Sequence, residues 1–198
     1  NISFKANQGE TVAFIGSTGS GKSTLINLVP RFYDVTDGEV LIDGINVKDY
    51  DLELLHNKIG YVPQKAVLFN GTVSSNVAYG ENGAGSITEE KIKEAIKVAQ
   101  GTEFVEKMED TYQAHIAQGG TNVSGGQKQR LAIARAIARD PEIYIFDDSF
   151  SALDYKTDSI LRHELKKYTK KATSLIVAQR IGTIMNADKI IVLDKGKC

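Results

Sequence analysis

Short apolar runs alternate with amphipathic segments of helical period along most of the chain. The runs are rich in β-branched and aromatic residues and are bounded by glycine, proline or polar residues, which is typical of buried strands. They are TVAFI (residues 11–15), IGYV (59–62), EIYIFD (142–147), TSLIVA (173–178) and KIIVL (189–193). Helices are expected for KSTLINLV, ending at Pro30, and around residues 157–169. Strands that alternate with helices predict an α/β fold with a parallel sheet covered by helices.

The middle of the chain has a different pattern. In TEEKIKEAIKVAQ the apolar residues recur at helical spacing, and Thr88 is placed to cap the helix. The residues expected on its buried face are Ile92, Ala95, Ile96 and Ala99. We therefore expect residues 66–138 to form a helical subdomain inserted into a core of residues 1–65 and 139–198. Within that core, EVLID and INV flank the pair Asp43-Gly44, which predicts a small antiparallel hairpin.

Composition limits the kind of protein this is. With 198 residues and a mass of 21.6 kDa the chain has room for one domain with an insertion. The net charge of −1 gives no basic footprint for nucleic acid, and no apolar run resembles a signal peptide or a membrane span. The single cysteine, Cys198, excludes a disulfide framework and a cysteine metal site and fits a reducing compartment. Because the chain starts in a strand pattern without methionine and stops just after a strand, we expect it to be part of a longer protein.

A phosphate-binding loop follows the first predicted strand. GSTGSGKST matches G-x-x-x-x-G-K-[ST] between a strand and a helix, the context this motif requires. Glycines let the backbone amides and the helix N-terminus face an anion. Lys22 would reach the β- and γ-phosphates of a nucleotide, and the Ser23 hydroxyl would bind Mg²⁺. The residues assigned to the nucleotide are Gly16, Ser17, Thr18, Gly19, Ser20, Gly21, Lys22, Ser23 and Thr24.

Two adjacent carboxylates end the apolar run IYIFD. In phosphate-loop sites a second apolar strand beside the first ends in an aspartate that holds Mg²⁺. Asp147 is therefore assigned to the metal side, together with Ser23. Asp148 would then lie near the γ-phosphate, where a base could activate water.

A second glycine-rich segment, VSGGQ, leads into a predicted helix that stops before Pro141. It offers a serine hydroxyl and free amides at a helix N-terminus but has no lysine and follows no strand. Taken in order, GSTGSGKST, Gln64 after YVP, NVSGGQKQR, IYIFDD and SALD (151–154) resemble the nucleotide-binding domain of an ABC transporter. LFNGTVSSNVAYG (68–80) resembles exporters in which the transmembrane and nucleotide-binding domains share one polypeptide.

The resemblance implies a P-loop NTPase (RecA-like) core and a helical subdomain that carries the VSGGQ signature. Two such domains pack head to tail, and each ATP with its Mg²⁺ lies between the phosphate loop of one and the signature of the other. Gln64 would lie near Mg²⁺ and the attacking water. The residues that the resemblance adds to the nucleotide site are Ser124, Gly125, Gly126, Gln127 and Asp154. The implied location is the cytoplasmic face of the cell membrane, with the transmembrane domain in a part of the polypeptide outside this sequence.

The sequence departs from the family pattern at four places. Asp148 replaces the usual catalytic glutamate, Gln179 in VAQR replaces the switch histidine, and Gln118 in AQGG replaces a glutamate. The aromatic residue that stacks on adenine lies upstream of this sequence. Aspartate is shorter than glutamate by about 1 Å, an error that can cost about 100-fold in rate. Gln179 can donate a hydrogen bond but cannot titrate. Asp148, Gln179 and Gln64 therefore occupy catalytic positions in a site expected to be slow, as in the degenerate subunit of a heterodimeric ABC exporter.

Three other interpretations stay open. A symmetric, fully active exporter would require that the shorter Asp148 reaches the water after a small shift. DNA-maintenance ATPases share these motifs, but they carry a long coiled coil between phosphate loop and signature, and no sustained heptads separate Lys22 from Ser124. A P-loop kinase or GTPase would leave VSGGQ and SALD unexplained.

Overall fold

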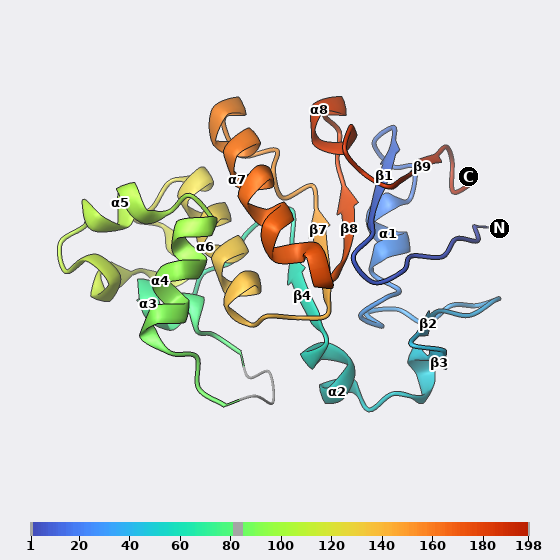
Figure 1. Ribbon diagram of the computed structural model, residues 1–198, viewed down its shortest axis with the longest axis horizontal. Helices are drawn as coiled ribbons and strands as arrows, with labels where there is room; N and C mark the ends of the chain where they lie inside the picture. The colour runs from blue at the N-terminus through green and yellow to red at the C-terminus, as the bar shows by residue number, and fades with distance from the viewer. Residues whose placement is uncertain (1, 81–84, 198) are drawn as a thin grey trace.

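The computed structural model describes residues 2–80 and 85–197, so Asn1 and Cys198 lie outside the described residues (Figure 1). Within these ranges a five-stranded sheet has the order β4-β7-β8-β1-β9, and all neighbouring strands are parallel. Its strands are β1 (Thr11–Gly16), β4 (Ile59–Val62), β7 (Ile143–Asp147), β8 (Thr173–Val177) and β9 (Lys189–Leu193). The predicted α/β class is confirmed.

Alternate residues of the central strands pack on opposite faces of the sheet. On β1, Val12 and Phe14 pack into one buried cluster and Ala13 into the other. The first cluster lies under α1 (Lys22–Ile26) and α2 (Leu52–Asn57), and the second lies under α6 (Gly125–Ala138) and α7 (Tyr155–Tyr168). In Figure 1, α7 crosses in front of the sheet. The carboxyl ends of β1, β7 and β8 are therefore rigidly held at one edge, where loops can carry chemistry.

The small antiparallel element predicted at Asp43-Gly44 is present. β2 (Leu41–Ile42) pairs with β3 (Ile45–Asn46). The turn has positive φ at both residues, 53° at Asp43 and 79° at Gly44, as a tight two-residue hairpin requires. A 3₁₀ turn, Val47–Asp49, follows the hairpin.

Helices gather beyond the β4 edge of the sheet (Figure 1). They are α3 (Val73–Val77), α4 (Glu89–Val98), α5 (Thr102–Glu106) and the start of α6, with 3₁₀ turns at Thr111–Gln113 and Gln118–Gly120. Thr88 caps α4 as predicted, because its side chain accepts a hydrogen bond from the Lys91 amide. All four residues of the predicted apolar face are buried. The same region also holds a short two-stranded sheet that the sequence analysis missed, β5 (Gly71–Thr72) with β6 (His115–Ile116).

Three local expectations need correction. The helix expected to reach Pro30 ends at Ile26, and residues 27–31 continue as turns. Pro30 disfavours helical geometry in the residue before it. The strand pattern at the start of the chain becomes a strand only at Thr11, after a turn in which the Glu10 amide bonds Asn7. β7 does not lie beside β1, because β8 is inserted between them.

The remaining elements are α8 (Ile181–Ile184) and the 3₁₀ turn Thr169–Lys171. None of the described helices has the length and hydropathy needed to cross a membrane.

Candidate nucleotide-binding site

The phosphate loop joins β1 to α1 through three glycines with positive φ: 153° at Gly16, 79° at Gly19 and 96° at Gly21. A side chain at Gly16 would meet the Leu193 carbonyl oxygen at 2.1 Å, so only glycine fits there. The space at Gly19 is open. The loop can therefore turn tightly against β9 while its outer side stays accessible to a ligand.

Lys22 is buried inside this loop. Its Nζ donates to the carbonyl oxygens of Gly16 and Ser17, both at 2.8 Å, and to Ser20 Oγ at 3.3 Å. Within the described part of the chain, the amides of Gly19, Gly21, Lys22 and Ser23 donate to no protein acceptor. These amides and an ammonium group at a helix N-terminus form a donor set that fits a polyphosphate. Ser17, Thr18 and Thr24 are exposed around the loop.

Asp147 is connected to the loop by the Ser23 hydroxyl, which donates to Asp147 Oδ1 at 2.7 Å. Among the described residues no group of three or more His, Cys, Asp or Glu side chains is placed to hold a metal. Mg²⁺ takes one or two protein oxygens and completes its shell with water and phosphate oxygens, and the adjacent oxygens of Ser23 and Asp147 form such a pair. Ser23 and Asp147 would hold the ion on the protein side, and its charge would offset that of the phosphates.

Asp148 follows Asp147 in the sequence and is buried, with 7% of its surface exposed. Its backbone is in the left-handed region, with φ of 48°, and its amide donates to the Val177 carbonyl at 3.0 Å. Burial raises the pKa of Asp148, and the charge of Asp147 adds to this effect.

Two amide side chains bind one oxygen of Asp148. Gln179 Nε2 donates to Asp148 Oδ2 at 3.0 Å, and Gln64 Nε2 donates to the same oxygen at 3.3 Å. The structure thus brings together the three residues assigned to catalysis. Gln64, which the sequence analysis also assigned to the metal, bonds to Asp148 and leaves its amide oxygen for another partner.

The signature residues form a separate group at the start of α6. Ser124 caps this helix in a capping box with Gln127, and Gly125 is exposed. A Cβ on Gly126 would lie 3.4 Å from the Ala152 carbonyl oxygen. No hydrogen bond between described residues joins this group to the phosphate loop. Asp154 caps α7 by accepting from the Thr157 amide at 2.9 Å, which holds the pKa of Asp154 below its usual range.

Sequence reasoning missed Tyr61. Its hydroxyl lies 2.9 Å from Asn27 Oδ1 and 3.4 Å from Asp147 Oδ2. β4 pairs with β7 so that Tyr61 is opposite Ile145, two residues before Asp147. A tyrosine in an otherwise apolar strand was the available signal, but it points to Asp147 only once these strands are known to be neighbours.

Comparison with known proteins agrees with this geometry. The family model described as ABC transporter matches residues 1–151. The chain is 51% identical over 197 residues to an uncharacterized ABC transporter ATP-binding protein of Mycobacterium tuberculosis, covering 100% of this chain and 34% of that protein. It is 46% identical over 196 residues to a Staphylococcus aureus protein named for multidrug export, an ATP-binding/permease protein, covering 99% and 33% respectively.

Among solved structures, a bacterial Atm1-family ABC exporter with ATP bound superposes with a TM-score of 0.92 at 36% sequence identity. That match covers 99% of this chain and 34% of the exporter chain, so the P-loop NTPase fold is confirmed. The chain spans about a third of the length of the curated relatives it matches. Since the family model covers most of its residues, the chain belongs to the ABC transporter family.

Proposed function

We propose that the chain is the ATP-binding domain of an ABC exporter whose own site hydrolyses ATP slowly. The domain would pair head to tail with a second ATP-binding domain, with Mg-ATP held between the phosphate loop of one and the signature of the other. Family membership and the exporter relatives support the general role. The observation that best supports slow hydrolysis is that the side-chain amides of Gln179 and Gln64 both donate to Asp148 Oδ2.

The residues at the site divide the work. Lys22 and the loop amides would bind and orient the phosphates, while Ser23 and Asp147 would hold Mg²⁺. Bound Mg-ATP supplies the phosphoanhydride bond and the positive charge that stabilises its cleavage. Asp148 would accept the proton of the attacking water. Gln64 and Gln179 stabilise the ionised carboxylate by donation, and neither amide can take up a proton in turn. Because aspartate is one methylene shorter than glutamate, its carboxylate would stop about 1 Å short of the water, and an error of this size makes it a poor base for this step.

The signature residues would act on another subunit. Ser124, Gly125 and Gly126 present a hydroxyl and a helix N-terminus on the surface, as a site for the γ-phosphate held by a partner requires. Asp154 would support the nucleotide site by fixing the start of α7 beside the Ala152 carbonyl. In this proposal residues 66–138 form the subdomain that carries the signature, and residues 1–65 and 139–198 form the core.

A degenerate site is useful only if the partner is competent, so the proposed partner is a non-identical subunit with glutamate and histidine at the two positions. The relatives named as ATP-binding/permease proteins support a transmembrane domain on the same polypeptide, and hence a place on the cytoplasmic face of the cell membrane. A symmetric exporter with two active copies of this site is the alternative, and the buried Asp148 carboxylate, held by Gln64 and Gln179, is the feature that favours it.

Subunit-resolved nucleotide trapping tests the proposal. The intact transporter is incubated with photoreactive azido-ATP labelled on either the α- or the γ-phosphate, crosslinked during turnover, and separated into its subunits. We expect this subunit to retain the two labels in nearly equal amounts, because bound ATP is cleaved there only slowly. Loss of the γ-label at the rate seen in the partner would show a competent site. A variant with Lys22→Ala is the control for labelling that does not depend on the phosphate loop.

A further inference from the structure

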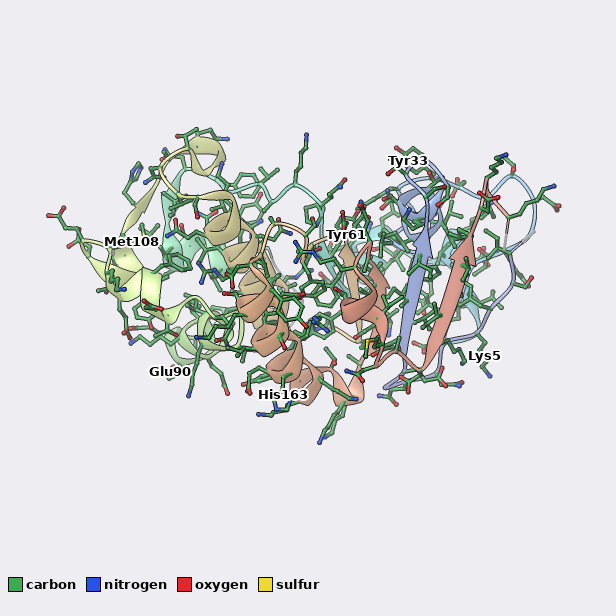
Figure 2. All side chains as sticks on the ribbon, turned by 90° about the horizontal axis from the view of Figure 1, so that it is seen from above. Lys5, Tyr33, Tyr61, Glu90, Met108 and His163 are labelled. Carbon is green, nitrogen blue, oxygen red and sulfur yellow. The ribbon has the colours of Figure 1, made fainter. Side chains whose placement is uncertain are left out.

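The Tyr61 side chain lies where α1, β4 and β7 meet. It is partly buried, and its ring packs edge-on against Phe32 with centroids 5.3 Å apart. Its hydroxyl lies between Asn27, the C-cap residue of α1, and Asp147 at the end of β7. In Figure 2 Tyr61 lies on the same side of the molecule as Tyr33, opposite His163 on α7.

We propose that Tyr61 is a positioning residue for Asp147 and thereby sets the Mg²⁺ affinity of the site. This inference rests on the proposed role of Asp147 beside the metal. The Ser23 hydroxyl holds Oδ1 of that carboxylate at 2.7 Å, and the Tyr61 hydroxyl is the group within reach of Oδ2 at 3.4 Å. The two hydroxyls together fix the plane of the carboxylate.

The single proton of the Tyr61 hydroxyl determines which hydrogen bond Asn27 can make. A phenol has one proton, so it cannot donate to Asn27 Oδ1 and to Asp147 Oδ2 at once. If the Asn27 amide turns by half a rotation, its NH₂ group donates to the phenol oxygen and the phenol proton is free for Asp147. The two ends of an amide side chain have nearly the same shape, so this rotation keeps the packing of Asn27. Asn27 then orients Tyr61, which orients Asp147.

The chemistry of the two oxygens favours this arrangement. Coordination of Mg²⁺ by Ser23 would use the lone pairs of its hydroxyl oxygen, while its proton still points to Asp147 Oδ1. The Oδ2 atom would be free to rotate away without a second donor. A phenol keeps its proton at neutral pH, so the Tyr61 hydroxyl is available as a donor. Partners of metal ligands commonly change metal affinity by about 10- to 100-fold when they are removed.

Tyr61→Phe tests the inference in the intact transporter. The variant keeps the ring contact with Phe32 and removes only the hydroxyl. Crosslinking of azido-ATP to this subunit is measured against MgCl₂ concentration and again with EDTA. We expect the Mg²⁺ concentration for half-maximal labelling to rise by about three- to tenfold, somewhat below the usual range because the contact is long. Labelling in EDTA should stay unchanged. An unchanged Mg²⁺ midpoint would overturn the inference.

Two further variants separate the possible failures. Tyr50→Phe also removes a partly buried phenol, one that donates to the Ile42 carbonyl at 3.1 Å away from the site, and its Mg²⁺ midpoint should not move. A shift in both tyrosine variants would indicate general loosening and would overturn the positioning role. Asp147→Asn should shift the midpoint more than Tyr61→Phe. If Asp147→Asn had no effect, the proposed metal site itself would fail, whereas an effect of Asp147→Asn alone would reject only the role of Tyr61.

Discussion

Gln179 donates a hydrogen bond to Asp148, with 3.0 Å between Nε2 and Oδ2. These are the two positions at which the chain departs from the expected glutamate and histidine, and the structure places them in direct contact. Gln64 joins them at the same oxygen. The two departures therefore form one unit, and substitutions there should be strongly coupled.

Restoring both residues should increase hydrolysis at this site. Asp148→Glu extends the carboxylate by one methylene, and Gln179→His replaces a fixed donor with a group that can hold a proton. A general base contributes about 10² to 10⁴-fold, so even partial recovery should be measurable by ATPase assay of the assembled transporter. The partner's own catalytic base is replaced by an amide, so that the measured ATPase activity comes from this site alone. Either single variant should recover less than the pair, and no gain from the pair would place the defect elsewhere.

Folding stability should depend on pH through Asp148. Burial raises the pKa of this carboxyl above its ordinary value of 3.8, so its favourable contribution to folding exists at low pH and is lost as the pH rises through the folded-state pKa. Asp148→Asn stays neutral and can still accept from both amides. We expect it to raise the free energy of unfolding at about pH 7, with a smaller gain near pH 4. Urea denaturation at the two pH values measures this, and a gain independent of pH would contradict it.

Arg135 should be a strong stability determinant of the helical part. Its guanidinium donates to the Asn76 carbonyl at 2.7 Å, to Asn76 Oδ1 and to the Val67 carbonyl. The same group lies over the rings of Phe69 and Tyr79. Burial lowers its pKa to about 10. Lysine cannot reproduce the fork of donors.

Arg135→Lys is therefore expected to cost about 2 to 3 kcal/mol of unfolding free energy, the range for lost hydrogen bonds to a charged group. Arg31→Lys is the matched control. Arg31 bonds the exposed Asp34 and the Lys48 carbonyl at the surface, so its replacement should cost less than about 1 kcal/mol. Equal losses in the two variants would show that the donor geometry of Arg135 has no special weight.

Much of this site could be predicted from the sequence because its motifs lie within short segments of the chain. The phosphate loop depends on glycines and a lysine within one short segment, and its position between β1 and α1 follows from the pattern of the neighbouring residues. The hairpin at Asp43-Gly44 and the cap at Thr88 are equally local. Such features are set by backbone geometry that few residue types allow.

Contacts that depend on the order of strands in the sheet could not be predicted from the sequence. β8 lies between β7 and β1, and this strand order is not specified by any motif within the strands themselves. The contact of Tyr61 with Asp147 requires β4 and β7 to be neighbours, and that of Asp148 with Gln179 requires β7 beside β8. The β5–β6 pair has two residues in each strand, too few for a periodic signal.

Steady-state ATPase activity of the assembled transporter, compared between Gly126→Asp and Asp148→Asn in this subunit, tests the central claim most directly. An aspartate at Gly126 would place a negative charge at the signature, beside the Ala152 carbonyl, where the partner's γ-phosphate is proposed to bind. Loss of one preorganised donor to such a group costs about 3 to 4 kcal/mol. Gly126→Ala, whose Cβ would make ordinary van der Waals contact with the Ala152 carbonyl oxygen at 3.4 Å, is the control for size. We predict that Gly126→Asp abolishes most turnover at saturating Mg-ATP while Asp148→Asn reduces it much less. Greater damage from Asp148→Asn would make this a catalytic subunit and contradict the degenerate site.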